Sequence, residues 1–151
     1  MIEAEEDAMR CAACLGPEVQ VYLEYTENKF GSLNGPMWAF LWGFARLLSE
    51  MNGNIRMRKQ TLLLYTEMLP DDRAAAREGK HRIDEILLAM RQKGFSTTAL
   101  AWAFIGILTN IMSQSSHRLI PDDYLRAERE TRQFTEDLIT SLNKARRTLL
   151  N

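Results

Sequence analysis

Hydrophobic positions along this chain recur three and four residues apart, which is the spacing of one face of an α-helix. The pattern predicts seven helical segments, near residues 2–15, 18–30, 37–51, 55–68, 72–93, 97–115 and 122–149. No segment shows the β-branched alternation of a half-buried strand, so no sheet is expected. The predicted fold class is an all-α, compact, single-domain bundle of six to seven helices over residues 1–151.

Prolines and glycines mark the expected helix boundaries. Each of the four prolines precedes a helical pattern: Pro17, Pro36, Pro70 and Pro121. Proline suits the first turn of a helix because its missing N–H would be unpaired there. The Gly16-Pro17 pair predicts the break between the first two segments. Gly79, in a polar stretch of the fifth segment, is a further candidate break.

Two segments are apolar on every side, at residues 37–45 and 99–108. A helix that is apolar all round is buried all round, so these Trp-rich segments are expected to be the central helices of the bundle. Small residues recur on one face of each segment and would allow neighbouring helices to approach closely. These residues are Ala39 and Gly43 in the first segment, and Ala99, Ala103 and Gly106 in the second.

Composition and charge describe an ordinary globular chain. Its 151 residues match the length of one domain of about 150 residues, and 46% hydrophobic residues are too many for a disordered chain. A formal net charge of −1 gives no global attraction to nucleic acid or to anionic membranes.

The acidic residues 2–7 do not resemble a secretory signal. The most apolar run, residues 99–112, is shorter than the roughly 18 residues of a membrane span. We therefore expect no membrane span and an intracellular location, which for a viral or injected protein means the host-cell interior.

Cys11 and Cys14 form a CxxC motif, the first candidate for chemistry. Such a pair supplies a reactive thiolate where positive groups or a helix N-terminus lower the thiol pKa. The preceding residues 3–7 are mostly acidic and would raise the pKa instead. Two structural thiols on one helix face are the favoured interpretation, and a helical thiol-redox protein is kept as an alternative.

Other combinations of reactive residues are incomplete. His81 and His117 lie far apart in the sequence, and the CxxC pair would need both to complete a zinc site. Ser116 precedes His117, but no Gly-x-Ser-x-Gly turn exists to expose a nucleophile. Neighbouring carboxylates such as Asp71 and Asp72 diverge by about 100° on a helix, so they cannot share a metal or a proton. The chain also lacks a phosphate-binding glycine loop. We predict no catalytic residue, cofactor or metal.

Arginine outnumbers lysine in this chain, and two groups of basic residues are candidate contacts for an anion or a nucleic acid. They are Arg56, Arg58 and Lys59, then Arg126, Arg129 and Arg132. The first group opens a helix, where positive charge opposes the helix dipole and hints at an anionic partner. The second group forms one ridge, but a Glu128–Arg132 pair at i,i+4 would partly neutralise it. Solvated, salt-bridged helix faces are the favoured interpretation.

The last segment carries a further candidate interface. Its apolar residues step by four, three and four, which is a short coiled-coil-like seam: Leu138, Leu142, Ala145 and Leu149. The seam predicts helix packing, either onto the core of the same chain or against a partner helix. Its length does not decide between them.

The leading functional hypothesis is a non-enzymatic protein-interaction module (an adaptor, scaffold or regulatory domain) that self-associates. The expected partner is a protein, with a second copy of the chain as one candidate. Nucleic-acid binding through the arginine-rich helix faces is the first alternative, and thiol-redox chemistry is the second. A small apolar ligand between the aromatic helices is a further one.

Overall fold

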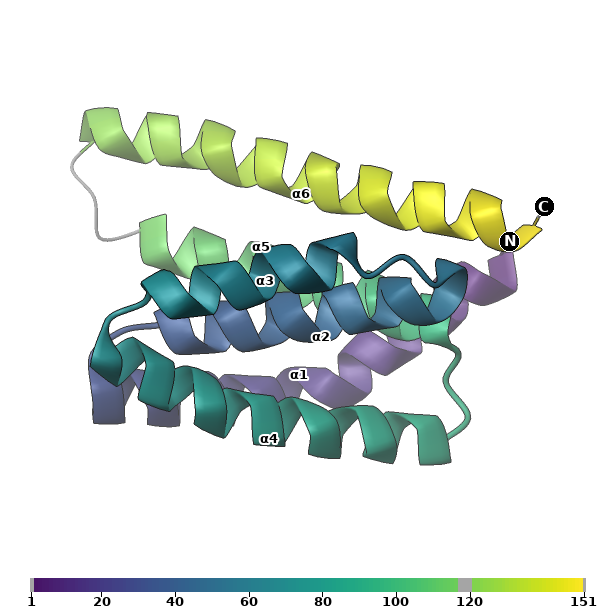
Figure 1. The fold of residues 1–151 in the computed structure, drawn as a ribbon, viewed down its shortest axis with the longest axis horizontal. Coiled ribbons are helices and arrows are strands. Elements are labelled where there is room, and N and C mark those ends of the chain that lie inside the picture. Colours follow the sequence, from purple (N-terminus) through teal and green to yellow (C-terminus); the bar gives the residue numbers. More distant parts are fainter. Residues whose placement is uncertain (1, 117–120, 151) are drawn as a thin grey trace.

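The computed structural model describes the backbone of residues 2–116 and 121–150, and the side chains of residues 6–114 and 125–147. Within these ranges the chain forms six helices and no strand, which confirms the all-α fold class (Figure 1). The helices are α1 (Ile2–Phe30), α2 (Asn34–Asn52), α3 (Arg56–Glu67), α4 (Pro70–Gln92), α5 (Thr97–Ser116) and α6 (Pro121–Leu150).

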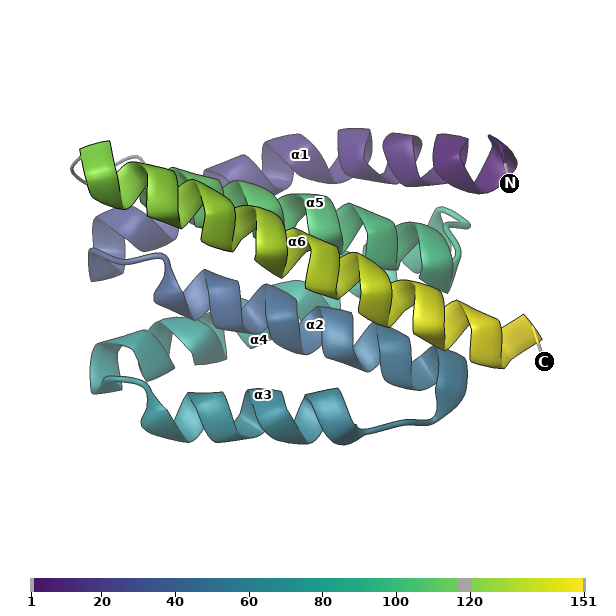
Figure 2. The same ribbon diagram turned by 90° about the horizontal axis from the view of Figure 1, so that it is seen from above.

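The two Trp-rich segments lie inside the bundle, as predicted. Helix α2 packs against α3, α4, α5 and α6, and α5 packs against α1, α2 and α6. Seen from above, α6 crosses over α2 and α5, while α1 and α3 lie along opposite edges (Figure 2). Phe40, Phe44 and Phe104 are fully buried, and the rings of Phe40 and Phe104 meet edge to face at 5.3 Å.

Helix α1 runs without a break through Gly16 and Pro17, so the predicted boundary between residues 15 and 18 is wrong. Buried residues continue at helical spacing on both sides of the proline: Cys11, Leu15, Val19 and Leu23. Pro17 removes one backbone donor, and both Pro17 and Ala13, whose carbonyl loses its bond, lie on the exposed face of the helix. Packing of the continuous apolar stripe therefore outweighs the local preference for a break.

Gly79 is not a break either, because α4 is continuous around it. A Cβ atom at Gly79 would lie 2.5 Å from the Tyr22 hydroxyl oxygen and 2.7 Å from Ala39 Cβ. Both distances are shorter than ordinary carbon contacts, so only glycine fits at this point. Gly79 is therefore a site of close packing between α4, α1 and α2.

Two further glycines bring α2 close to its neighbours. A Cβ atom at Gly35 would collide with the backbone and side chain of Ala75 on α4. At Gly43 it would lie 2.7 Å from the Phe104 ring and 2.9 Å from Ile83. These contacts confirm the prediction of close approach at the small residues of α2.

The same prediction is wrong for Gly106 on α5. A Cβ atom there would meet nothing within 4 Å, and the residue is exposed.

Among the described residues, no helix is long and apolar enough to cross a membrane, which agrees with the expectation from the sequence.

We expect Gly79→Ala to lower the free energy of unfolding, measured by urea denaturation. Overpacking against Tyr22 and Ala39 costs about 1–3 kcal/mol and outweighs the gain in helix propensity, which is about 1 kcal/mol. Gly106→Ala is the matched control and should stabilise the protein, since the added methyl group meets open space. A stabilising effect of both changes would contradict the close-packing role of Gly79.

Candidate interaction surface

Helix α3 links α2 to α4 but lies on the outside of the bundle, packed chiefly on α2. Thr61 is its one buried residue. Five large apolar side chains on α3 and beside its two ends are exposed, and we call them the α3 surface: Ile55 (47%), Leu62 (52%), Leu63 (64%), Leu64 (47%) and Leu69 (70%). Large apolar side chains that gather exposed on one element are candidates for an interaction site.

The inner face of α3 is held by one buried tryptophan. The Trp38 indole Nε1 donates a hydrogen bond of 2.7 Å to the Thr61 carbonyl oxygen. The Trp38 ring lies 5.1 Å from the Tyr65 ring, whose hydroxyl accepts a hydrogen bond of 2.8 Å from Arg77 Nη1 on α4. Helix α3 is thus fixed to both of its sequence neighbours, and its other face is left to solvent.

A groove of about 410 Å³ continues the α3 surface toward α2 and the start of α4. It is lined by Asn34, Met37, Trp38, Leu41, Leu64, Glu67, Met68, Leu69 and Asp72. Methionines give such a surface the flexibility to accommodate different shapes. The ionisable side chains of the lining are both acidic, and Asp72 accepts a hydrogen bond of 3.1 Å from Asn34 Nδ2.

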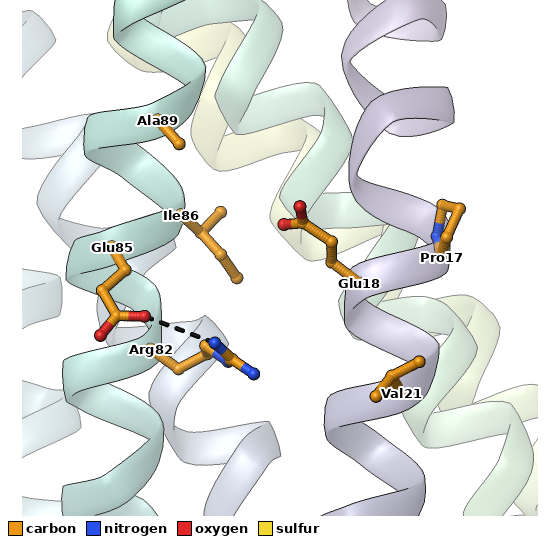
Figure 3. Close-up of a pocket in the computed structure, with 7 residues that line it drawn as sticks. All are labelled: Pro17, Glu18, Val21, Arg82, Glu85, Ile86 and Ala89. Atoms are coloured by element: carbon orange, nitrogen blue, oxygen red, sulfur yellow. Dashed lines mark hydrogen bonds and ion pairs between the residues drawn. The ribbon is translucent and has the colours of Figure 1, made fainter.

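A second groove, of about 520 Å³, lies between α1 and α4 (Figure 3). It is lined by Pro17, Glu18, Val21, Arg82, Glu85, Ile86 and Ala89. The Glu18 side chain points across the groove toward α4, where Arg82 pairs with Glu85 at 3.4 Å. These lining residues offer carboxylates and a guanidinium but no thiol, imidazole or hydroxyl group.

The apolar seam of the last segment is occupied by this chain itself. Leu138, Leu142 and Ala145 are buried where α6 packs on α2 and α5. The side chain of Leu149 lies outside the described residues. Of the two interpretations that the sequence leaves open, the structure shows packing onto the chain's own core at these three positions.

The two basic groups belong to different parts of the surface. Arg56, Arg58 and Lys59 lie at the N-terminus of α3, and Arg58 is half-buried. The exposed residues Arg126, Arg129 and Arg132 lie on the N-terminal half of α6, on the α5 side of the bundle and away from α3 (Figure 2). The Glu128–Arg132 pair expected from the spacing is present at 3.9 Å. The two groups do not form one continuous basic face.

The CxxC cysteines have different environments. Cys11 is fully buried and Cys14 is exposed, and both are free thiols. Burial raises the pKa of the Cys11 thiol to about 11, and the neighbouring Cys14 adds to the rise. A buried thiol of raised pKa is a poor nucleophile, so this environment disfavours Cys11 itself as a reactive thiolate.

The histidines do not add a site within the described residues. His81 is exposed on α4, and His117 lies outside the described residues. Across the described side chains, no three His, Cys, Asp or Glu residues are placed to hold a metal ion.

Comparison with known proteins finds no matching family model, no matching curated sequence and no matching solved structure.

The α3 surface was not among the candidates from the sequence, although a signal for it exists. Three consecutive leucines at residues 62–64 point in directions that span about 200° of a helix. One side of a short helix cannot bury all three against a single neighbour. Such a run in a short amphipathic segment therefore indicates that part of its apolar surface stays exposed.

We expect Trp38→Phe to lower the free energy of unfolding by about 0.5–1.5 kcal/mol, because the Thr61 carbonyl loses its indole donor. Hydrogen exchange should accelerate in α3 more than in α5. Trp102→Phe is the control, since the partly buried Trp102 of α5 does not touch this hydrogen bond. Unchanged exchange in α3 of the Trp38 variant would show that the indole does not hold this helix.

Thiol labelling provides a test of the cysteine environments. With an aromatic disulfide reagent at pH 8, one thiol should react rapidly and the other only as fast as the protein opens, because Cys11 is buried and protonated. Cys14→Ser should leave only the slow thiol. Two rapidly reacting thiols would contradict the burial of Cys11.

Proposed function

We propose that the protein is a non-enzymatic protein-interaction module that associates with a second copy of itself. The observation that carries this proposal is the α3 surface, where five large apolar side chains are exposed on and beside one short helix. Complete burial of a fully exposed leucine side chain is worth about 1.5–3 kcal/mol, and covering these side chains, which are 47–70% exposed, gains part of that energy.

The rigidity of α3 supports its role in binding. An isolated helix of 12 residues is marginal in water, but Trp38 and Arg77 hold this one in place. A partner therefore meets a pre-formed surface and orders little new structure when it binds. Pre-organisation of this kind increases affinity because the entropy of ordering is already spent.

Nucleic-acid binding is less well supported. The two basic groups lie on different parts of the surface, and Arg132 is paired with Glu128. Single-stranded nucleic acids are bound by aromatic side chains beside a continuous basic groove. The described parts of α3 and α6 offer leucines rather than exposed aromatic rings next to these arginines.

The test of the proposal is the mass of the protein in solution, measured by light scattering over a hundredfold range of concentration. We expect the weight-average mass to rise from the 17.4 kDa of one chain toward twice that value. A constant mass of 17.4 kDa at millimolar concentration would contradict self-association.

The nucleic-acid alternative predicts binding that weakens steeply with salt, because phosphate contacts release counterions. We expect no mobility shift of random-sequence RNA or duplex DNA in 50 mM salt. A shift that disappears at higher salt and in an Arg126→Ala/Arg129→Ala variant would instead favour nucleic-acid binding.

A further inference from the structure

One ridge of α3 carries opposite charges at its two ends and a leucine between them. Lys59, Leu63 and Glu67 are spaced i, i+4 and i+8, so they lie in a row along the outer side of the helix. All three side chains are exposed, and Leu63 is exposed by 64%. Within the described part of the chain, neither Lys59 nor Glu67 takes part in an ion pair.

The row is complementary to itself. Lys59 and Glu67 each lie four residues from Leu63, which is about 6 Å along the helix axis. A two-fold axis at Leu63 would set two copies of α3 antiparallel, with each Lys59 beside Glu67 of the other copy. We infer that a second copy of the chain binds here, through an antiparallel α3–α3 contact centred on Leu63. This inference rests on the proposed function and assigns the surface that performs it.

The helix dipoles favour the same arrangement. The basic residues Arg56, Arg58 and Lys59 lie at the electropositive N-terminus of their own helix, which is an unfavourable position. In the antiparallel pair they lie near the electronegative C-terminus of the other α3 and near its Glu67. The second copy thus supplies the anionic partner that the basic residues at this helix N-terminus hint at.

The apolar part of the contact lies at the centre of the helix. Helix α3 spans residues 56–67, so Leu62 lies at its middle and Leu63 is the next residue. Leu62 and Leu64 flank Leu63 in the sequence, and Leu64 lines the methionine-containing groove. A pair of 12-residue helices is about 18 Å long, and such a contact lies at the small end of specific interfaces, near 1,200 Å². The dimer is therefore expected to dissociate on dilution into the micromolar range.

The first test removes the central leucine. We expect Leu63→Lys to raise the dissociation constant of the dimer about tenfold or more, because two like charges meet on the two-fold axis. Val21→Lys is the matched control, since Val21 is also 64% exposed but lies on α1 at the opposite edge of the bundle. Circular dichroism and urea denaturation should show both variants folded, because neither side chain is buried.

The second test reverses the charges of the row. Lys59→Glu and Glu67→Lys should each weaken the dimer about fivefold in 50 mM salt, since like charges then face each other. The double variant Lys59→Glu/Glu67→Lys restores both pairs and should recover the affinity of the original protein. Singles that weaken the dimer without recovery in the double variant would overturn the antiparallel arrangement.

The outcomes separate this inference from the proposed function. A wild-type dimer that is equally stable in Leu63→Lys would overturn the α3–α3 contact and leave self-association intact. A wild-type protein that stays monomeric at all concentrations would overturn self-association itself. A larger effect of Val21→Lys than of Leu63→Lys would move the interface to the groove between α1 and α4.

Discussion

The close contact between α2 and α4 determines where α3 can lie. Gly35 and Gly79 bring the two backbones so near that a single methyl group at either position would collide. The polypeptide that joins these helices, residues 53–69, therefore has no space between them. It must pass around the outside of the pair, and α3 becomes a helix with one packed side.

The outer position of α3 explains its unusual surface. A helix that packs on one neighbour can bury only a narrow stripe, and in α3 this stripe contains Thr61 and the half-buried Met57 and Tyr65. Trp38 fills the gap beneath it and satisfies its indole N–H on the Thr61 carbonyl. The leucines beyond this stripe cannot reach the core. Their exposure is a consequence of the connection between α2 and α4.

Much of the fold follows from the hydrophobic pattern alone. The segments at residues 37–45 and 99–108 are apolar all round, and the structure places them at the centre, in α2 and α5. The errors occurred at Gly16-Pro17 and at Gly79, where local rules predict or allow a break. In both cases the deciding factor is contact with other helices, which a local rule does not contain: a continuous buried stripe in α1, and a lack of space around Gly79.

Helices α3 and α6 show the limit of the pattern. The run of leucines at residues 62–64 indicates exposure, but the pattern alone does not say which apolar face remains uncovered. Leu138 and Leu142 on α6 fit either a partner interface or the chain's own core in the sequence, and they are buried against α2 and α5. Leu62 and Leu63 on α3, by contrast, are exposed. Both helices carry enough apolar residues to pack on the core, but α2 has limited surface once α4 lies in direct contact with it. The longer helix α6 crosses both α2 and α5, while α3 is confined by its short links to the edge of α2. Which apolar helix face remains uncovered is thus decided by chain connectivity, and only the three-dimensional arrangement reveals it.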